Sequence, residues 1–259
     1  MPLIECYNLT RYYGDIPAVQ DVSLTVEGGE IFGFLGPNGA GKTTTIKLLT
    51  GLLRPTAGRC LIGGHDVHLE PIAAKSLLAY IPDNPFLYDK LTGREFLNLM
   101  ADLYRIPRAG RKERIDNLLH LFELEDKGDA LIGSYSRGMR QKIVLAGALI
   151  HDPIVVFLDE PTVGLDPRGA RLIQSVLRLL TQRGAAVFIS THSLGIAEQL
   201  CHRVAIINKG RLIAQGTVEE LKAQSLTTSA EKNAPSLEEI FLQLTGSPDE
   251  EELLRYLNK

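Results

Sequence analysis

The chain carries an apolar strand, a glycine-bearing loop and a helix in direct succession, and this run constrains the fold more than any other segment. Ile31–Leu35 is a short apolar stretch, typical of a buried strand. The loop Gly36–Thr43, GPNGAGKT, follows at once, and a helical stretch Thr44–Leu53 then reaches Arg54-Pro55, where proline ends it. The loop matches the pattern G-x-x-x-x-G-K-[S/T], whose glycines permit a turn that points successive backbone N–H groups at an anion.

This pattern predicts a site for ATP with magnesium. We expect Lys42 to contact the β- and γ-phosphates and the Thr43 hydroxyl to ligate Mg²⁺, while the following helix directs its positive N-terminal end at the phosphates. The alternative is an ordinary tight glycine turn, but a preceding strand and a following helix are what phosphate binding requires. The predicted phosphate-binding residues are Gly36, Pro37, Asn38, Gly39, Ala40, Gly41, Lys42, Thr43 and Thr44.

A second apolar run, Ile154–Leu158, ends in Asp159-Glu160. An open α/β sheet binds its ligand at the carboxyl ends of its strands, so these carboxylates are expected beside the phosphates. Asp159 then suits magnesium, directly or through water, and Glu160 suits the general base that orients the attacking water. A solvated acidic turn is the alternative, and the phosphate loop argues against it.

Strands and helices alternate along the rest of the chain. Ala185–Ser190 reads as a third strand, with the helical stretch Ala170–Gln182 before it. This alternation predicts a mostly parallel sheet covered on both faces. Leu91–Ile150 has helical periodicity, for example in Arg94–Tyr104 and Arg111–Glu123, and is interpreted as a helical insertion.

The C-terminal part of the chain begins with an expected hairpin, Val204–Ile207 and Arg211–Ala214, around a glycine-bearing turn. Leu226–Pro235 is polar and predicted to be a linker, and Ser236–Leu244 and Asp249–Leu257 are predicted to be short amphipathic helices. The predicted division is an ATP-binding core of residues 1–84 and 151–216, a helical subdomain of residues 85–150, and a C-terminal linker with short helices, 217–259.

Composition narrows the classes of function. The 259 residues are 44% hydrophobic and carry a net charge of -3, so no overall basic field attracts nucleic acid, and no nucleic-acid partner is expected. Cys6, Cys60 and Cys201 lack metal-ligand spacing and are interpreted as reduced thiols of a cytoplasmic protein. No stretch approaches the ~18 uninterrupted apolar residues of a membrane span, so the chain alone is expected to stay in the cytoplasm.

A further segment, Tyr135–Lys142 with sequence YSRGMRQK, makes the interpretation more specific. Together with the loop and the acidic strand it resembles the nucleotide-binding domain of ATP-binding cassette proteins, whose signature is L-S-G-G-Q. Ser136 and Gly138 match that signature, whereas Tyr135, Arg137 and Met139 depart from it. A Ser-x-Gly before a helix is by itself an ordinary helix cap, but here the helix, Met139–Ile150, leads directly into the acidic strand.

The resemblance extends from Ile4 to Gly216 and implies a fold, a P-loop NTPase of the α/β class with an N-terminal antiparallel β-region and a helical subdomain inserted into a mostly parallel sheet. It implies that Tyr13 stacks on the adenine, with Val19 packed nearby. Tyr12 and Tyr7 remain alternatives for the stacking role.

Three more positions take roles from the resemblance. His192 matches the switch histidine that contacts the γ-phosphate, and Gly164-Leu165-Asp166 resembles the D-loop that touches a partner subunit. Asp83 stands where the family usually has Gln, as a shorter and charged candidate for the magnesium or the catalytic water. The expected catalytic residues are therefore Lys42, Glu160 and His192, the metal residues are Thr43, Asp83 and Asp159, and Ser136 and Gly138 join the nucleotide-binding set.

The resemblance also implies partners. Two such subunits pair head to tail, a homodimer in the simplest case, and each ATP lies between the phosphate loop of one and the Ser136 segment of the other. The loop residues supply Lys42 but no obvious arginine finger in cis, which agrees with charge stabilisation from a second copy. Asp83–Tyr104 is expected to receive a short helix of a separate transmembrane permease, which places the subunit at the cytoplasmic face of the membrane.

Several functions remain open at this stage. The first is the ATP-hydrolysing subunit of a membrane transporter, with export favoured by Asp83, by the S-R-G-M form of the signature, and by a C-terminal tail, including Ser236–Phe241, that is too short for the β-domain of many importer subunits. The second is a soluble cassette ATPase acting on ribosomes or DNA, although such proteins usually carry two cassettes or a long coiled-coil insertion. The third is a small-molecule kinase, in which Glu160 and His192 have no required place.

Overall fold

The computed structural model describes residues 1–161, 165–226 and 236–246. Three features predicted from the sequence therefore lie outside the described residues, wholly or in part: the linker Leu226–Pro235, the helix Asp249–Leu257, and Gly164 of the D-loop segment. Within the described residues, no helix is long and apolar enough to cross a membrane.

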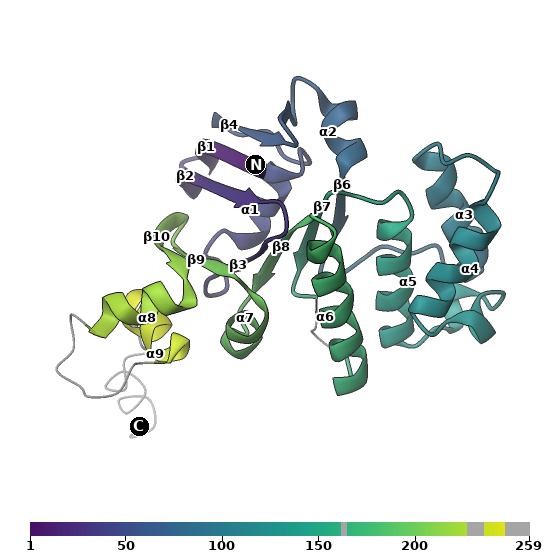
Figure 1. The fold of residues 1–259 in the computed structure, drawn as a ribbon. Coiled ribbons are helices and arrows are strands. Elements are labelled where there is room, and N and C mark those ends of the chain that lie inside the picture. Colours follow the sequence, from purple (N-terminus) through teal and green to yellow (C-terminus); the bar gives the residue numbers. More distant parts are fainter. Residues whose placement is uncertain (162–164, 227–235, 247–259) are drawn as a thin grey trace, which may run out of the picture.

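A six-stranded sheet forms the centre of the molecule (Figure 1). Its strand order is β10-β9-β3-β8-β7-β6, and every neighbouring pair is parallel except β9 and β10. The strands are β3 (Ile31–Leu35), β6 (Leu78–Ile81), β7 (Val155–Asp159), β8 (Ala186–Thr191), β9 (Arg203–Asn208) and β10 (Arg211–Thr217). The predicted mostly parallel sheet is thus confirmed, and its buried strands are the apolar runs of the sequence because both faces are covered.

The register of the central strands brings their carboxyl ends together. Leu35 at the end of β3 pairs with Thr191 of β8, and Asp159 at the end of β7 pairs with Ser190. The phosphate loop leaves β3 at this edge, so the loop and the acidic pair become neighbours although more than a hundred residues separate them in sequence.

A second, antiparallel sheet lies beside the first, as expected for the N-terminal region. Its order is β2-β1-β4-β5, with β1 (Pro2–Tyr13), β2 (Ile16–Glu27), β4 (Ala57–Ile62) and β5 (His65–Asp66). The helix α1 (Lys42–Leu49) contributes Ile46, Leu48 and Leu49 to a core that it shares with both sheets. This helix ends before the predicted Leu53 because Gly51 adopts a left-handed φ of 67°. A short helix, α2 (Pro71–Leu77), follows β5.

The helices α3 (Gly93–Leu103), α4 (Arg111–Leu121) and α5 (Arg137–Leu149) gather on one side of the central sheet (Figure 1). Single turns of 3₁₀ helix, 125–127 and 132–134, connect α4 to α5. All of these elements fall within residues 85–150, and the boundaries of the predicted subdomain remain predictions.

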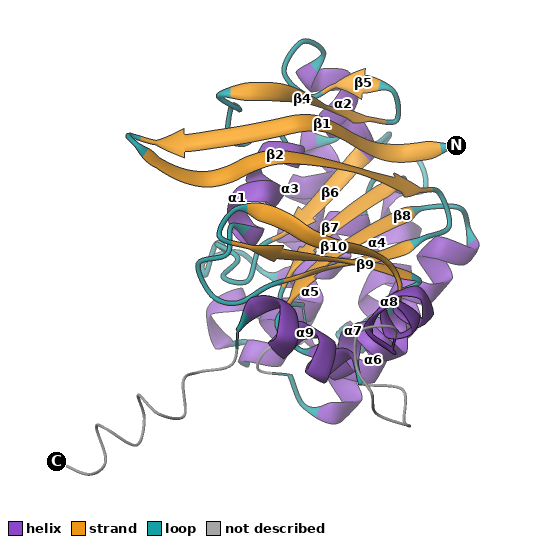
Figure 2. Ribbon diagram, turned by 90° about the vertical axis from the view of Figure 1, so that its left-hand side faces the viewer, coloured by secondary structure: helices purple, strands orange, loops and turns teal. Residues whose placement is uncertain are grey.

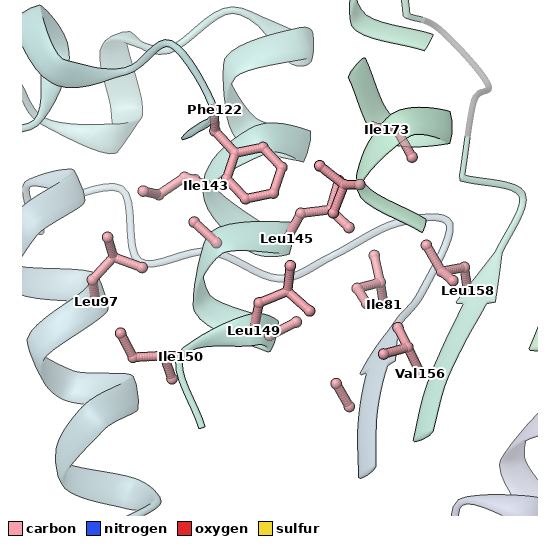
Figure 3. Close-up of a cluster of buried hydrophobic side chains, with 14 of the residues drawn as sticks. Ile81, Leu97, Phe122, Ile143, Leu145, Leu149, Ile150, Val156, Leu158 and Ile173 are labelled. Atoms are coloured by element: carbon pink, nitrogen blue, oxygen red, sulfur yellow. The ribbon is translucent and has the colours of Figure 1, made fainter. Parts of the chain in front are cut away.

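Figure 3 shows how this helical side joins the sheet. Leu97 of α3, Phe122, and Ile143, Leu145 and Leu149 of α5 are buried with strand residues in one apolar cluster. The strand side of that cluster includes Ile81, Val156 and Leu158, and α6 (Pro167–Gln182) adds Ile173. The position of α5 relative to β7 is therefore fixed by side-chain packing.

The C-terminal elements gather at the other side of the sheet. β9 and β10 form the predicted hairpin, in which Lys209 and Gly210 adopt positive φ values of 47° and 79°. The helices α7 (Leu194–Leu200), α8 (Val218–Leu226) and α9 (Leu237–Thr245) lie together in both views (Figures 1 and 2). They share a third apolar core with the ends of β3 and β9.

Candidate nucleotide site

The phosphate loop depends on glycine at two positions of close approach. A Cβ on Gly36 would lie 2.5 Å from the carbonyl oxygen of Ile207, and one on Gly41 would lie 2.5 Å from that of Ala18. Gly41 also adopts a φ of 109°, and Gly39 a φ of 80°, a region that side chains other than glycine rarely enter. The loop can therefore lie directly against β9 and β2.

Lys42 folds back over its own loop. Its Nζ donates to the carbonyl oxygens of Gly36, at 2.7 Å, and Pro37, at 3.2 Å, and the residue is only 8% exposed. Burial lowers the pKa of Lys42, and the nearby charges of Glu160 and Asp159 oppose that shift. A phosphate group placed in the loop would therefore meet a poorly hydrated ammonium, against which an anion gains more than it would in water.

Asp159 is held by two hydroxyl groups. Thr43 Oγ1 donates to Asp159 Oδ2 at 2.9 Å, and Ser190 Oγ donates to Asp159 Oδ1. Hydroxyl and carboxylate oxygens are the donors that Mg²⁺ prefers, and a magnesium site in a phosphate-transfer enzyme needs only one or two carboxylates, because water and phosphate supply the remaining ligands. Thr43 and Asp159 therefore fit a magnesium ion, although the described residues contain no group of three or more acidic, His or Cys side chains suited to a metal.

Glu160 is fixed in an unusual backbone conformation beside this pair. Its φ is 51°, which costs about 1–2 kcal/mol for a residue with a Cβ, and its N–H donates to the carbonyl oxygen of Ser190 at 3.0 Å. The carboxylate accepts from Thr191 Oγ1 at 3.1 Å and lies 2.8 Å from His192 Nδ1. An ionised carboxylate only accepts hydrogen bonds, so this contact suits the His192 tautomer that carries its proton on Nδ1. The side chain of Glu160 is 14% exposed and that of His192 is 60% exposed.

These groups surround one hollow of about 310 Å³. It is lined by Ala18, Pro37, Asn38, Gly39, Gly41, Lys42, Thr43, Thr44, Asp83, Asp159 and Glu160. Asp83 thus joins the predicted metal residues at one surface, whereas Gly36 and Ala40 of the loop are not among the lining residues, and Ala40 is buried. A larger hollow of about 680 Å³ lies between α3 and α4, but it brings together none of the predicted site residues.

The residues expected near the adenine do not gather at one surface. Tyr13, at the end of β1, is 48% exposed, and the Arg11 guanidinium lies 5.1 Å from its ring centroid. Val19 is fully buried in the core of the N-terminal sheet, so the structure does not bring its side chain to the hollow. Successive residues of a strand face opposite sides, and Ala18 is the residue of β2 that lines the hollow. Tyr12 and Tyr7 are also exposed, at 39% and 38%.

Ser136 and Gly138 lie apart from the hollow, at the start of α5. Ser136 is the N-cap of that helix, and its hydroxyl accepts from the Met139 N–H at 3.3 Å. Tyr135 is buried, and its hydroxyl donates to the Lys127 carbonyl at 2.6 Å, so the departure from leucine at this position is accommodated by the fold. One copy of the chain therefore does not unite the Ser136 segment with Lys42.

The sequence-based prediction missed two residues of the site. Ser190 and Thr191 hold the carboxylates of Asp159 and Glu160, yet the sequence had given them no role. Hydroxyl residues at the end of the strand that precedes His192 were the available signal. Asp166 of the D-loop segment caps α6 by accepting from the Gly169 N–H at 2.7 Å.

Comparisons with known proteins agree with this geometry. Residues 19–163 match the family model described as ABC transporter. The daunorubicin resistance ATP-binding protein DrrA3 of Streptomyces coeruleorubidus is 42% identical over 215 residues, which cover 83% of this chain and 68% of that protein. The probable multidrug ABC transporter ATP-binding protein YbhF of Escherichia coli is 36% identical over 96% of this chain and 43% of its own length.

Among solved structures, one described as the ATP binding subunit of an ABC transporter superposes with a TM-score of 0.86. It is 34% identical and covers 93% of this chain and 99% of that chain. The chain thus spans nearly all of that subunit, but less than half of YbhF.

Proposed function

The chain belongs to the ABC transporter family, whose ATP-binding subunits are ATPases, and we propose that it hydrolyses ATP with Mg²⁺ to drive a membrane transporter, in the direction of export. One observation carries the proposal. Glu160, clamped by Thr191 and His192, lines the same hollow as Lys42 of the phosphate loop. A kinase also places a carboxylate beside its acceptor hydroxyl, so the choice of water as the acceptor is supported by the family, whose ATP-binding subunits are ATPases.

Each group has a place in the reaction. The loop N–H groups and Lys42 bind the phosphates, and Thr43 and Asp159, with Asp83 nearby, would hold Mg²⁺, which would supply positive charge against the phosphate oxygens. Glu160 accepts a proton from the attacking water. At the same time the water oxygen bonds to the γ-phosphorus, and the bond from that phosphorus to the ADP oxygen breaks. His192 keeps that carboxylate in place and offers its exposed edge to the γ-phosphate.

A second copy of the chain would complete the site. The loop and Glu160 lie on the core, whereas Ser136 and Gly138 lie at the exposed start of α5. The N-terminal turn of α5, with its backbone N–H groups and its serine cap, suits the γ-phosphate of a nucleotide bound to another subunit. We therefore propose a head-to-tail homodimer that closes on two ATP molecules and separates after hydrolysis.

The membrane partner would bind a groove beside Asp83. This hollow of about 270 Å³ is formed by the segment after β6 together with α3 and α5. Phe86 and Leu103 line it and remain 84% and 67% exposed, so a short amphipathic helix would bury them. ATP-binding subunits of this family pair with transmembrane components, and a permease helix seated here would hold the subunit at the cytoplasmic face of the membrane.

The direction of transport is supported by the relatives' names. DrrA3 is named for daunorubicin resistance, YbhF for multidrug transport, and a Bacillus subtilis relative, 39% identical over 87% of this chain and 93% of its own, for SkfA peptide export. These names concern those proteins. They motivate export as the direction for this chain, as does the S-R-G-M form of its signature segment.

Phosphate release from ATP by the full chain, with Mg²⁺ and no added acceptor, tests the hydrolytic part. Release at many turnovers per chain supports an ATPase, and release only after adding a small-molecule acceptor would identify a kinase instead.

To test the membrane partner, the tagged chain is purified from membranes of its own cells. A co-purifying permease should be lost with Phe86→Ser and Leu103→Ser but kept with Leu69→Ser, a control residue that is 83% exposed away from the groove.

A further inference from the structure

The helix α9 is built into the body of the molecule. Leu237 and Ile240 are 0% and 3% exposed and pack in the third apolar core with α7, α8 and the ends of β3 and β9. Leu242, on another face of α9, is 37% exposed. The helix starts at a capping box in which Ser236 Oγ accepts from the Glu239 N–H and the Glu239 carboxylate accepts from the Ser236 N–H. Contacts therefore hold both the packed face of α9 and its first turn.

Two contacts connect this C-terminal region to α7. The side chains of Leu237 and Ile240 share a core with Ala197, which is fully buried on α7. Lys222 of α8 forms an ion pair with Glu198 of α7. Figures 1 and 2 show α7 lying with α8 and α9 in both views. The short helix α7 thus packs on the C-terminal helices through Ala197, while Leu200 on the same helix joins the core of the central sheet.

The segment that enters α7 also holds the catalytic carboxylate. Ser193 N–H donates to Thr191 Oγ1 at 3.0 Å, and that hydroxyl donates to Glu160 at 3.1 Å. His192 Nδ1 contacts the other oxygen of Glu160 at 2.8 Å. Thr191 is the last residue of β8 and is held by the sheet, whereas His192 lies in the two-residue connection from β8 to Leu194, the first residue of α7.

The same core touches the strand before the phosphate loop, but that strand is held independently. Leu35, at the end of β3, belongs to the core, yet β3 lies between β8 and β9 and is hydrogen-bonded to both. By contrast, α7 is seven residues long and depends on side-chain packing. A loosened α9 should therefore move α7 more than it moves the loop.

We infer that α9 is a positioning element for hydrolysis: by packing on α7, Leu237 and Ile240 set His192 against Glu160, whereas Thr191 is held by its place in β8. This inference rests on the proposed function, and it deepens it by making the C-terminal helix a control point for turnover. A partner that displaced α9 would slow hydrolysis while ATP stayed bound.

The test uses Ile240→Ala in the full chain, with Leu242→Ala as a control on the exposed face of the same helix. We expect kcat to fall roughly tenfold, well inside the ~10²-fold that a misplacement of about 1 Å can cost. KM and the Kd for ATP should stay within about twofold, because the phosphate loop is held by the sheet. Ile240→Val should recover most of the rate, and Leu242→Ala should leave it unchanged.

A double variant separates positioning from general loss of stability. If α9 acts through His192, Ile240→Ala combined with His192→Ala should be no slower than His192→Ala alone, because the two changes remove the same contact. Independent, multiplying losses would overturn the inference, as would an unchanged kcat in Ile240→Ala or a loss of ATP binding equal to the loss of rate.

Hydrogen exchange gives a readout that does not need hydrolysis. The Ser193 amide, bonded to Thr191 Oγ1, should exchange faster in Ile240→Ala than in Leu242→Ala, while the amides of β3 stay protected. Equal exchange at Ser193 in the two variants would refute the inference. If the unmodified chain releases no phosphate, the proposed ATPase function fails, and the exchange result still decides whether α9 holds this segment.

Discussion

Replacing Glu160 by Gln probes the assigned chemistry most directly. The amide matches the carboxylate in shape, and the positive φ of 51° depends on the backbone and its bond to Ser190, which the change leaves intact. The remaining oxygen can accept from Thr191, while the amide NH₂ faces His192 Nδ1. That ring adapts by carrying its proton on the other nitrogen. The phosphate loop and Lys42 are untouched, so ATP should bind as before.

The size of the effect follows from the role of the lost group. An amide cannot accept the proton of the attacking water, and general base catalysis is worth about 10²–10⁴-fold, or about 2.7–5.4 kcal/mol of barrier. One rearranged hydrogen bond costs only ~1 kcal/mol of folding stability. We therefore expect kcat to fall at least a hundredfold, with the Kd for ATP within about twofold and the unfolding midpoint nearly unchanged.

Steady-state phosphate release and nucleotide binding measure the two quantities separately. Glu113→Gln, an exposed carboxylate on α4, serves as the matched control and should keep full activity. The Glu160 variant should also collect as an ATP-bound dimer in sedimentation, since two sites filled with unhydrolysed nucleotide hold the interface closed. Near-normal turnover with unchanged binding would refute the assignment of Glu160 as the base.

Three further expectations follow. Lys42→Ala removes charge-assisted bonds worth ~1.5–3 kcal/mol, so ATP binding should weaken about 10- to 100-fold, whereas Lys75→Ala, away from the hollow, should leave titrations of a fluorescent nucleotide unchanged. Phe188→Ala empties a centre where its ring lies 5.3–5.6 Å from those of Phe32, Phe34 and Phe157, and urea unfolding should show a loss of ~3–5 kcal/mol; a loss below ~1 kcal/mol would contradict that packing. Burial raises the pKa of Cys6 to about 12, so at pH 8 only about one Cys6 thiol in 10⁴ is ionised, against about one in four for an ordinary thiol of pKa ~8.5. Cys6 in the native chain should therefore resist iodoacetamide until the chain is denatured. Fast alkylation of Cys6 in the native chain, read by mass spectrometry, would argue against its burial.

The sequence predicted the centre of the fold well because buried parallel strands are continuous apolar runs. Ile31–Leu35 has the same bounds in the structure as in the prediction. The phosphate loop needed only local spacing, since its glycines, lysine and threonine act within a single turn. Local rules failed at the end of α1, where Gly51 adopts a left-handed conformation, and at α2, where seven residues gave too little periodicity to recognise.

Contacts between distant strands were beyond local reasoning. The clamp of Ser190 and Thr191 on the acidic pair requires the register of β7 against β8, which no spacing within one segment reveals. The resemblance assigned Val19 to the surroundings of the adenine, which stays a prediction, and the structure adds that Ala18, its neighbour on β2, lines the hollow. The packing of α9 on α7 likewise joins segments separated by residues whose sequence resembles a linker.

The position of Lys42 also bears on which ligands the loop accepts. Two of the three donors of its ammonium already bond to the carbonyl oxygens of Gly36 and Pro37, so one donor is left for an incoming anion. A single phosphate can take that donor and some of the loop amides, while a triphosphate can supply oxygens to more of the loop amides at the same time. We therefore expect the loop to bind linked phosphates more tightly than a single one, so that inorganic phosphate released after hydrolysis competes only weakly with the next ATP.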